Sequence, residues 1–541
     1  MKRTVLILGS LLFFVQAESQ YITDSTRWYF FTDKEGTEYT VDQPEEFLSQ
    51  RSIDRRGWQS LAVDETDLPV SNVYVEDLEA LGLEILYTSK WLNGVLVKSG
   101  NTAMLDTLDR LPFLSNKRWI PDPDNTYIPA KPGGERFPGP LETDASYSYG
   151  YSHGQITQLN LNRLHDMGYT GNGVLLTVLD AGFVALPDLP AFQTPLANNQ
   201  IVQTRNFVSG GENVYLDHSH GTNVSSIIFG NLPGQLIGTA PDVRVLLALT
   251  ENGYSETRIE EYSWIAGAEW ADSLGADVLN TSLGYTTFDD PATNYTYEDL
   301  DGNTAHISIA NGMTAAKGIV SVTSAGNEGS NDWYYISAPA DAENILAVGA
   351  VDTTGLLGTF SSRGPTSDHR IKPDVCATGK STVVQSTDGT IRYGSGTSFS
   401  SPMIAGATAV LWQSHPEWTA KEIIHEIVRS GDRYMNPDID YGFGIPDFYS
   451  AMTQIVEDVV VYEEIKVYPN PFHHIVTVDP GLNREDEFTM RLIDLQGRTV
   501  FESIRQSAGP VEIPPTLKPG LYILDIENNS IHRRTRVIHF E

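Results

Sequence analysis

The chain has 541 residues, 40% of them hydrophobic, which is enough for roughly three or four domains with buried cores. Acidic residues outnumber basic ones by 70 to 36, and the formal net charge is −34 at pH 7. An acidic balance of this size, with no large basic face, excludes nucleic acid and anionic membranes as binding partners. The single cysteine, Cys376, excludes an intrachain disulfide.

Residues 1–17 have the pattern of a secretory signal peptide. The first residues are basic, an apolar run covers residues 5–15, and Ala17 closes a small-residue cleavage pattern. A membrane span is the alternative, but the apolar run is about half of the ~20 residues that a bilayer requires. No later stretch is apolar over a greater length, so we expect no transmembrane segment and a protein that is exported.

Residues 18–120 mix helical and extended patterns. Helices are predicted at 72–81 and 104–111, and strands at 84–87 and 94–97. This mixture predicts a small α+β domain. The residues that follow, 121–140, are rich in proline and glycine, which predicts an exposed linker open to proteolysis.

Residues 145–455 have the alternating pattern of an α/β domain. Continuous apolar runs predict buried strands, and longer segments between them predict helices. The expected fold class is therefore a doubly wound parallel sheet, with the carboxyl ends of its strands at one edge. The predicted strands are 174–179, 243–249, 276–280, 318–322 and 345–351, and the predicted helices include 256–273 and 304–316.

Asp180 and His220 lie where an α/β sheet forms its sites. Asp180 follows the strand 174–179, at the edge where such sheets bind ligands. His220 opens an apolar segment with helical character, so its side chain is held at a helix start. A carboxylate can accept a hydrogen bond from an imidazole and fix its tautomer. Taken singly, a solvated strand end and a structural histidine are the alternatives.

Ser398 lies in the sequence GTSFSSP at residues 396–402, which runs into a small-residue stretch that predicts a buried helix. We expect Pro402 in the first helical turn, where its missing N–H costs no hydrogen bond. Ser398 would then sit at the helix N-terminus, where free N–H groups and the helix dipole favour negative charge. A nucleophilic serine that attacks a carbonyl needs that environment. A serine that only caps the helix is the alternative.

These sequences resemble the subtilisin-like serine peptidases, the subtilases. The motifs DAG at 180–182, HGT at 220–222 and GTSFSSP at 396–402 occur in the family's order of aspartate, histidine and serine. SAGN at 324–327 is similar to the family's oxyanion-hole segment, and LNTSLG at 279–284 is similar to the strand that lines its substrate cleft. Together the matches place the resemblance over roughly residues 145–455.

The resemblance implies a role for each site residue. Ser398 would be the nucleophile and His220 the general base, with Asp180 orienting His220. Asn327 would donate a hydrogen bond to the oxyanion, and a simple turn asparagine is the alternative. The implied substrate-binding residues are Ser282, Leu283, Gly284, Ser324, Ala325 and Gly326. Asn223, where many subtilases carry a second histidine, departs from the pattern and leaves the subfamily open.

Catalysis by subtilases requires no cofactor, although members of the family often bind calcium. The acidic stretch at 289–303 offers oxygen ligands for that ion. Its spacing matches no EF-hand loop, so a solvated loop is the alternative, and the sequence assigns no metal ligand.

The position of residues 18–144 resembles that of the subtilase propeptide, a folding aid and temporary inhibitor. The chain is then expected to be made as a zymogen, and a structural domain without that role is the alternative. By the same resemblance, the C-terminal segment of this propeptide should occupy the active-site cleft before cleavage.

Residues 461–541 change to short alternating runs separated by turns, which predicts a small β-sandwich. Segments at 465–471, 490–498 and 518–524 resemble the sorting domain that Bacteroidetes-type bacteria use for type IX secretion. This implies the type IX machinery as a partner, and a secreted or cell-surface location reached through the periplasm. A generic accessory β-module is the alternative.

The predicted function is a secreted serine endopeptidase that hydrolyses proteins or peptides through an Asp-His-Ser triad and an acyl-enzyme intermediate. A non-catalytic adhesin or binding protein on a subtilase fold is the alternative. A lipase or esterase is excluded because the Gly-x-Ser-x-Gly elbow is absent around Ser398. The sequence leaves open the cleavage preference, the physiological substrate, the processing sites and the oligomeric state.

Overall fold

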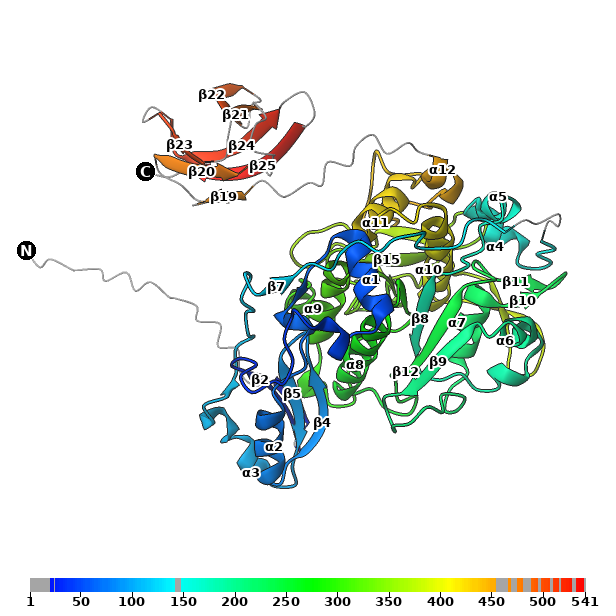
Figure 1. Ribbon diagram of the computed structural model, residues 1–541. Coiled ribbons are helices and arrows are strands. Elements are labelled where there is room, and N and C mark those ends of the chain that lie inside the picture. The colour runs from blue at the N-terminus through cyan, green and yellow to red at the C-terminus, as the bar shows by residue number, and fades with distance from the viewer. Residues whose placement is uncertain are drawn as a thin grey trace, which may run out of the picture. The chain divides into compact units, whose positions relative to one another are not determined.

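The computed structural model describes residues 20–23, 25–141, 147–453, 466–468, 474–479, 488–494, 498–505, 509–514, 517–527 and 532–539. The predicted signal peptide lies outside the described residues. The chain forms two compact units, Met1–Gln454 and Ile455–Glu541. Figure 1 shows the elements of both.

The larger unit is built on a sheet of seven parallel strands, which confirms the predicted doubly wound fold. All five predicted strands are present. The two outermost strands were not predicted, because β9 mixes apolar and polar residues that are mostly not buried, and β16 has only four residues. The order is β16 (Val375–Thr378), β15 (Leu346–Val351), β14 (Val320–Ser324), β13 (Val278–Thr281), β8 (Leu175–Asp180), β12 (Arg244–Leu249) and β9 (Ile201–Asn206).

Helices cover both faces of this sheet. Leu175 and Leu179 of β8 share a core with helices α8 (Ile259–Leu274) and α9 (His306–Met313). Side chains alternate along a strand, so Leu176 and Val178, also fully buried, face the other side. There α7 (His220–Phe229) packs against α10 (Thr397–Ser414). Every strand residue of β8 is buried, which explains its continuous apolar run.

The central helix α10 begins at Thr397, so the expectation that Pro402 lies in the first turn is wrong. Pro402 is inside the helix. It has no N–H to give to the carbonyl of Ser398, four residues earlier, and that carbonyl needs another donor. The prediction of a buried helix is confirmed, because the stretch from Ser400 to Gln413 is buried throughout.

The N-terminal part of the larger unit is the predicted small α+β domain. Its antiparallel sheet has the order β1 (Gln20–Thr23), β2 (Thr26–Phe31), β5 (Gly94–Lys98) and β4 (Glu84–Ser89). Figure 1 shows this sheet, in blue, beside the green helices α8 and α9. Trp28 of β2 stacks on Tyr262 of α8 with ring centroids 4.6 Å apart, so the two domains share an apolar core.

A buried ionic layer adjoins that core. Asp272 of α8 accepts from Arg55 at 2.5 Å and from Arg56 at 3.0 Å, and both arginines lie on α1 (Gln50–Gln59) of the N-terminal domain. Asp67 accepts from Arg56 at 2.6 Å and from Lys317 of the sheet domain at 3.0 Å. Each of these carboxylates is fully buried, so the charges stabilise the interface only while they remain paired.

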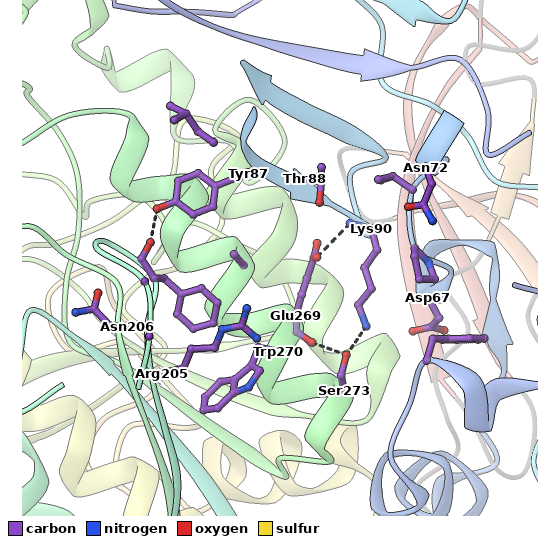
Figure 2. Close-up of a pocket in the computed structure, with 18 residues that line it drawn as sticks. Asp67, Asn72, Tyr87, Thr88, Lys90, Arg205, Asn206, Glu269, Trp270 and Ser273 are labelled. Atoms are coloured by element: carbon purple, nitrogen blue, oxygen red, sulfur yellow. Dashed lines mark hydrogen bonds between the residues drawn. The ribbon is translucent and has the colours of Figure 1, made fainter. Parts of the chain in front are cut away.

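A pocket of about 690 Å³ lies between the N-terminal domain and α8. Figure 2 shows Lys90 reaching across it, with its Nζ donating to Ser273 Oγ at 2.9 Å. Its backbone N–H donates to Glu269 at 3.1 Å. None of the site residues predicted from the sequence lines this pocket, so it is part of the domain interface.

The linker crosses the molecule at the amino ends of the strands. Arg136 forms a 3.1 Å ion pair with Asp277, the residue before β13, and its guanidinium lies 4.4 Å from the ring centroid of Trp412. Gln413 Nε2 donates to the carbonyl of Pro138 at 3.3 Å. The expectation that this segment occupies the active-site cleft is therefore wrong for residues 121–141. Most of them are exposed as predicted, but Phe137 is buried because it anchors the segment.

The smaller unit is the predicted β-sandwich. One antiparallel sheet contains β19 (Lys466–Tyr468), β20 (Ile475–Asp479) and β23 (Gly509–Glu512). Residues from both sheets, among them Val476, Val511, Met490 and Leu524, form one apolar core. The other sheet contains β22 (Thr499–Arg505), β21 (Phe488–Ile493), β24 (Gly520–Glu527) and β25 (His532–His539).

Candidate active site

Asp180 and His220, 40 residues apart in the chain, meet at the carboxyl edge of the sheet. His220 Nδ1 lies 2.8 Å from Asp180 Oδ1 and 3.0 Å from Oδ2. The Asp180 side chain is 1% exposed and the His220 side chain 27%, so the carboxylate is shielded while the imidazole reaches solvent. This is the geometry in which a carboxylate fixes the Nδ1–H tautomer and leaves Nε2 free to accept a proton.

The charge of Asp180 also sets the basicity of His220. Burial alone lowers the pKa of His220, because it disfavours the imidazolium. The nearby carboxylate and its hydrogen bond outweigh burial, and the resulting pKa lies above the ordinary value for histidine. The imidazole is thereby made a better proton acceptor.

Two glycines let β8 and α7 approach closely enough for this pair. Gly182 has a φ of 144°, and a Cβ there would lie 2.3 Å from the carbonyl oxygen of Leu216. A Cβ on Gly221 would lie 2.5 Å from the carbonyl oxygen of Gly182. The glycine of DAG and the glycine of HGT are therefore required by the close contact between their own loops.

Ser398 is the second residue of α10, close to the helix N-terminus as predicted. It is half-buried, and the ring of the adjacent Phe399 stacks on the His220 imidazole at 5.9 Å with an interplanar angle of 23°. This stacking ties the start of α10 to the start of α7. The sequence offered no signal for it beyond the aromatic residue itself.

The carbonyl oxygen of Ser398 has an unusual partner. Because Pro402 cannot donate to it, Ser282 Oγ does so at 3.0 Å. Ser282 Oγ in turn accepts from Asn280 Nδ2 at 2.9 Å, and Ser401 Oγ donates to Asn280 Oδ1 at 2.9 Å. These buried hydrogen bonds connect β13 and the segment after it to Ser398 and Ser401. Residues 398–401, at the start of α10, are called the serine turn below.

Asn327 lies beside the same turn. Its Oδ1 accepts from the Thr397 backbone N–H at 2.9 Å and from Thr397 Oγ1 at 3.1 Å, which leaves Nδ2 to face elsewhere. A Cβ on Gly396 would be 3.8 Å from the backbone nitrogen of Ser398 and 3.9 Å from Asn327 Nδ2. The Asn327 side-chain amide and the Ser398 N–H therefore lie in one neighbourhood beside Gly396, with Asn327 Oδ1 also 3.8 Å from the same point.

The residues predicted to line the cleft form two adjacent segments. Ser324 Oγ donates to the carbonyl of Leu283 at 3.2 Å, which joins residues 282–284 to residues 324–326. Gly326, with a φ of 107°, donates its N–H to Thr397 Oγ1 at 3.1 Å. A Cβ on Gly284 would lie 2.1 Å from Ser337 Oγ, so this strand has room for no side chain there.

His218 is a site residue that sequence reasoning missed. Its Nδ1 accepts the backbone N–H of His220 at 3.1 Å, the first free amide of α7. Its ring lies 6.3 Å from the His220 ring and is exposed. The HSH sequence at 218–220 was the available signal, because a ring nitrogen two residues before a helix start can serve as a cap.

Carboxylates of the acidic stretch 289–303 hold local turns. Asp290 accepts from the Ala292 N–H at 3.0 Å, and Asp301 accepts from the Asn303 N–H at 2.7 Å, so these carboxylates cap turns. Among the residues that the structure describes, no group of three acidic, histidine or cysteine side chains is arranged to hold a metal ion. In the same described residues, no helix combines the length and apolarity of a bilayer span.

Comparison with protein-family models gives three matches. Residues 171–445 match the subtilase family, residues 26–129 match the peptidase S8 propeptide domain of Bacteroidota, and residues 466–539 match the secretion system C-terminal sorting domain.

Individual proteins are similar over the first of these regions. Subtilisin of Bacillus pumilus is 33% identical over 309 residues, which cover 55% of this chain and 97% of that protein. Subtilisin E of Bacillus subtilis strain 168 is 33% identical over 304 residues, covering 55% of this chain and 70% of that protein. The crystal structure of MycP1 from Mycobacterium smegmatis matches with a TM-score of 0.45 and 22% identity, over 60% of this chain and 89% of that one.

Proposed function

Because this chain belongs to the subtilase family and is a serine endopeptidase, we propose that Asp180, His220 and Ser398 carry out its reaction. The observation that carries the proposal is the hydrogen bond between His220 Nδ1 and Asp180, with Phe399 holding the serine turn against the same imidazole. It leaves His220 Nε2 as the atom that accepts the Ser398 proton.

The acylation step follows from these positions. Ser398 Oγ attacks the scissile carbonyl carbon as His220 takes its proton, and the imidazolium is stabilised by Asp180. The negative charge on the carbonyl oxygen is met by Asn327 Nδ2 and by the Ser398 backbone N–H. His220 then protonates the leaving amine, and an acyl-enzyme remains on Ser398.

Deacylation uses the same groups in reverse. Water enters, gives its proton to His220 and attacks the acyl carbon, and Ser398 recovers its proton as the carboxylic acid leaves. No step requires a cofactor. We propose that residues 282–284 and 324–326 hold the substrate as an added strand, since they are adjacent and carry little side-chain bulk.

The rest of the chain supplies folding and export. The proposed boundaries are 18–144 for the propeptide and linker, 145–455 for the peptidase domain and 461–541 for the sorting domain; the family matches fall inside them. The sorting domain implies secretion or attachment to the cell surface. We propose that the type IX machinery carries the protein there from the periplasm.

Casein hydrolysis by single variants tests the assignment. Ser398→Ala and His220→Ala should each abolish hydrolysis while circular dichroism stays unchanged, because either substitution breaks the same proton transfer. The matched control is Ser414→Ala, a serine at the opposite end of the same helix from Ser398, which should retain the activity. Substantial hydrolysis by Ser398→Ala would refute the assignment and favour a binding protein whose activity came from a contaminant.

A further inference from the structure

We propose that Glu251 is a positioning residue for the active site, which acts as a neutral acid that shares one proton with Glu260. Loss of that proton at alkaline pH separates the loop after β12 from the start of α8 and lowers activity. The proposal rests on the proposed function, because the residues that Glu251 positions are those of the proposed site. Glu251 acts through its neighbours and not on the substrate.

Glu251 lies at the carboxyl edge of the sheet, just past the end of β12. The backbone N–H of its neighbour Thr250 donates to the carbonyl of Asp180 at 3.0 Å. Tyr285 directly follows the proposed substrate-binding residues 282–284, and its hydroxyl donates to Glu251 Oε2 at 2.5 Å. Glu251 therefore connects the strand beside the proposed catalytic aspartate to the segment that holds the substrate.

The loop that begins at Glu251 also packs against the start of α7. A Cβ on Gly253 would lie 3.5 Å from the Cβ of His218, so the two residues are in contact. The exposed His218 ring accepts the backbone N–H of His220 at 3.1 Å. The position of this loop therefore affects the residue that caps the helix of the proposed general base.

Glu251 and Glu260, called the acid pair below, are buried and in direct contact. Glu251 is 9% exposed and Glu260 is 4% exposed, and their side chains hydrogen-bond each other. An ionised carboxylate can only accept hydrogen bonds, so this contact requires a proton on one of the two. The geometry of the acid pair therefore implies one proton and one negative charge.

The partners of each group show which one holds the proton. Glu260 lies in the first turn of α8, where the helix dipole favours a carboxylate, and it accepts from the Thr257 N–H at 2.9 Å and from Ser255 Oγ at 3.4 Å. Glu251 Oε1 is buried and has no hydrogen-bond donor in the described part of the chain. A proton on Glu251 supplies the missing donor, whereas Glu260 keeps the charge.

Burial and like charge both favour the neutral form of Glu251. Burial is the larger cause that raises its pKa well above the ordinary value, and the charge of Glu260 adds to it. Glu256, on the loop, adds a further negative charge, and Asp289 lies next to Glu256. The phenols that face the acid pair are those of Tyr285 and, from the N-terminal domain, Tyr87.

Arg258 is the only basic residue between β12 and the first turn of α8, and its contacts lie elsewhere. Its Nε donates to the carbonyl of Thr293 at 2.8 Å, and its Nη1 lies 3.9 Å from Glu261. When Glu251 gives its proton to solvent, two carboxylates are left in contact and repel each other. The loop then moves off α8 and His218, and the alignment of the site is lost.

The alkaline limb of kcat/KM for peptide hydrolysis by the full chain tests the proposal. Glu251→Gln keeps an acceptor for Tyr285 and gains an N–H donor for Glu260, but it cannot ionise. At the pH where wild type has lost half of its kcat/KM, this variant should retain nearly all of its own. Glu251→Ala, which removes both hydrogen bonds, should be slower at every pH.

Glu256→Gln is the matched control, because Glu256 is an exposed acid on the same loop. It should leave the activity at neutral pH unchanged. It should move the alkaline limb slightly to lower pH, since it removes a charge that raises the pKa of Glu251. An alkaline limb of Glu251→Gln that coincides with that of wild type would overturn the proposal.

Infrared spectroscopy of the full chain detects the proton without any need for activity. Wild type should show the band of a protonated carboxylic acid that disappears across the alkaline limb, and Glu251→Gln should lack it. If that variant does not fold, the wild-type spectra alone decide, and no carboxylic acid band that titrates with the limb would overturn the proposal. A titrating band in a chain that hydrolyses no casein would refute the proposed function and leave the shared proton standing.

Discussion

Ser282 Oγ donates a 3.0 Å hydrogen bond to the carbonyl oxygen of Ser398, a carbonyl that is free because Pro402 has no N–H. The proline inside α10 thus makes the nucleophile's own backbone available to the cleft strand. Any movement of residues 282–284 is transmitted to Ser398, and the substrate-binding strand and the nucleophile are positioned together.

Removing this contact should slow the enzyme and weaken the fold. Ser282→Ala leaves the Ser398 carbonyl without its donor, and we expect a loss of stability of about 1–3 kcal/mol together with a lower kcat. Pro402→Ala restores a helical N–H at the right position, so the double variant should lose less stability than Ser282→Ala alone. Chemical denaturation of the four proteins of this cycle measures the coupling, and strictly additive losses would show that the two residues do not share this carbonyl.

Asn327 should contribute mainly to kcat. For Asn327→Ala we expect a loss of the size known for the oxyanion-hole asparagine of subtilisin, itself a subtilase, about 10² to 10³ in kcat. Asn327→Asp is the second variant, since it retains the acceptor for Thr397 but replaces the N–H donor with a negatively charged oxygen that repels the oxyanion. It should therefore lose at least as much kcat as Asn327→Ala, whereas an active Asp variant would reassign Asn327 to holding the turn.

The raised pKa of His220 predicts the acid limb of the pH profile. His220 must be neutral to accept a proton, so kcat/KM should fall as the pH drops through its pKa. Asp180→Asn removes the charge that raises this pKa, and the acid limb should move to lower pH while kcat falls by about 10⁴. An acid limb that does not move would show that another group controls it.

The raised pKa of His220 also makes the stability of the fold depend on pH. Because the pKa is higher in the folded state, the protonated form is the one that Asp180 stabilises. That contribution is complete below the unfolded pKa of histidine and is lost as the pH rises through the folded value. Thermal unfolding of wild type and Asp180→Asn across this range measures it.

Asp272 should be the most sensitive position of the domain interface. Asp272→Asn leaves Arg55 buried without its carboxylate partner and Arg56 with Asp67 alone, and we expect a loss of roughly 3–5 kcal/mol in the stability of the full chain. Burial raises the pKa of Asp272, but Arg56, Lys90 and Arg55 outweigh it and the net pKa is lowered. This contribution is therefore present above the ordinary aspartate pKa and is lost on acidification.

An exposed ion pair provides the matched control. Glu84 and Lys98 are 62% and 48% exposed and 3.5 Å apart, so Glu84→Gln should change stability by no more than about 1 kcal/mol. A similar loss for both variants by denaturant unfolding would contradict the importance given to the buried layer.

The residues of the candidate site could be predicted because each is marked by its immediate neighbours. Asp180 ends a continuous apolar strand, and the glycines of DAG and HGT mark the two loops in the sequence, although the contact that requires them is made between these loops. Contacts that depend on distant segments could not be predicted. Ser282 donates to the carbonyl oxygen of Ser398 only once the chain has folded. The same is true of the hydrogen bond by which His218 caps α7.

The prediction that the linker occupies the active-site cleft was wrong for the same reason. Its proline and glycine content indicated exposure correctly, but the partners of Arg136 are Asp277 and Trp412, which lie far along the sequence. The outer strand β9 was missed because most of its residues are exposed and it lacks a long apolar run, whereas β16 is buried but has only four residues. Composition therefore predicted the domains, while the contacts between them required the structure.

Mass-spectrometric mapping of a fluorophosphonate adduct tests the central assignment most directly. The reagent reacts with a serine only when a neighbouring base activates it, so the folded wild-type protein should carry the adduct on Ser398. His220→Ala, which retains the serine, should lose the adduct together with casein hydrolysis. An adduct on a different serine, or full casein hydrolysis by a protein that is never labelled at Ser398, would contradict the account.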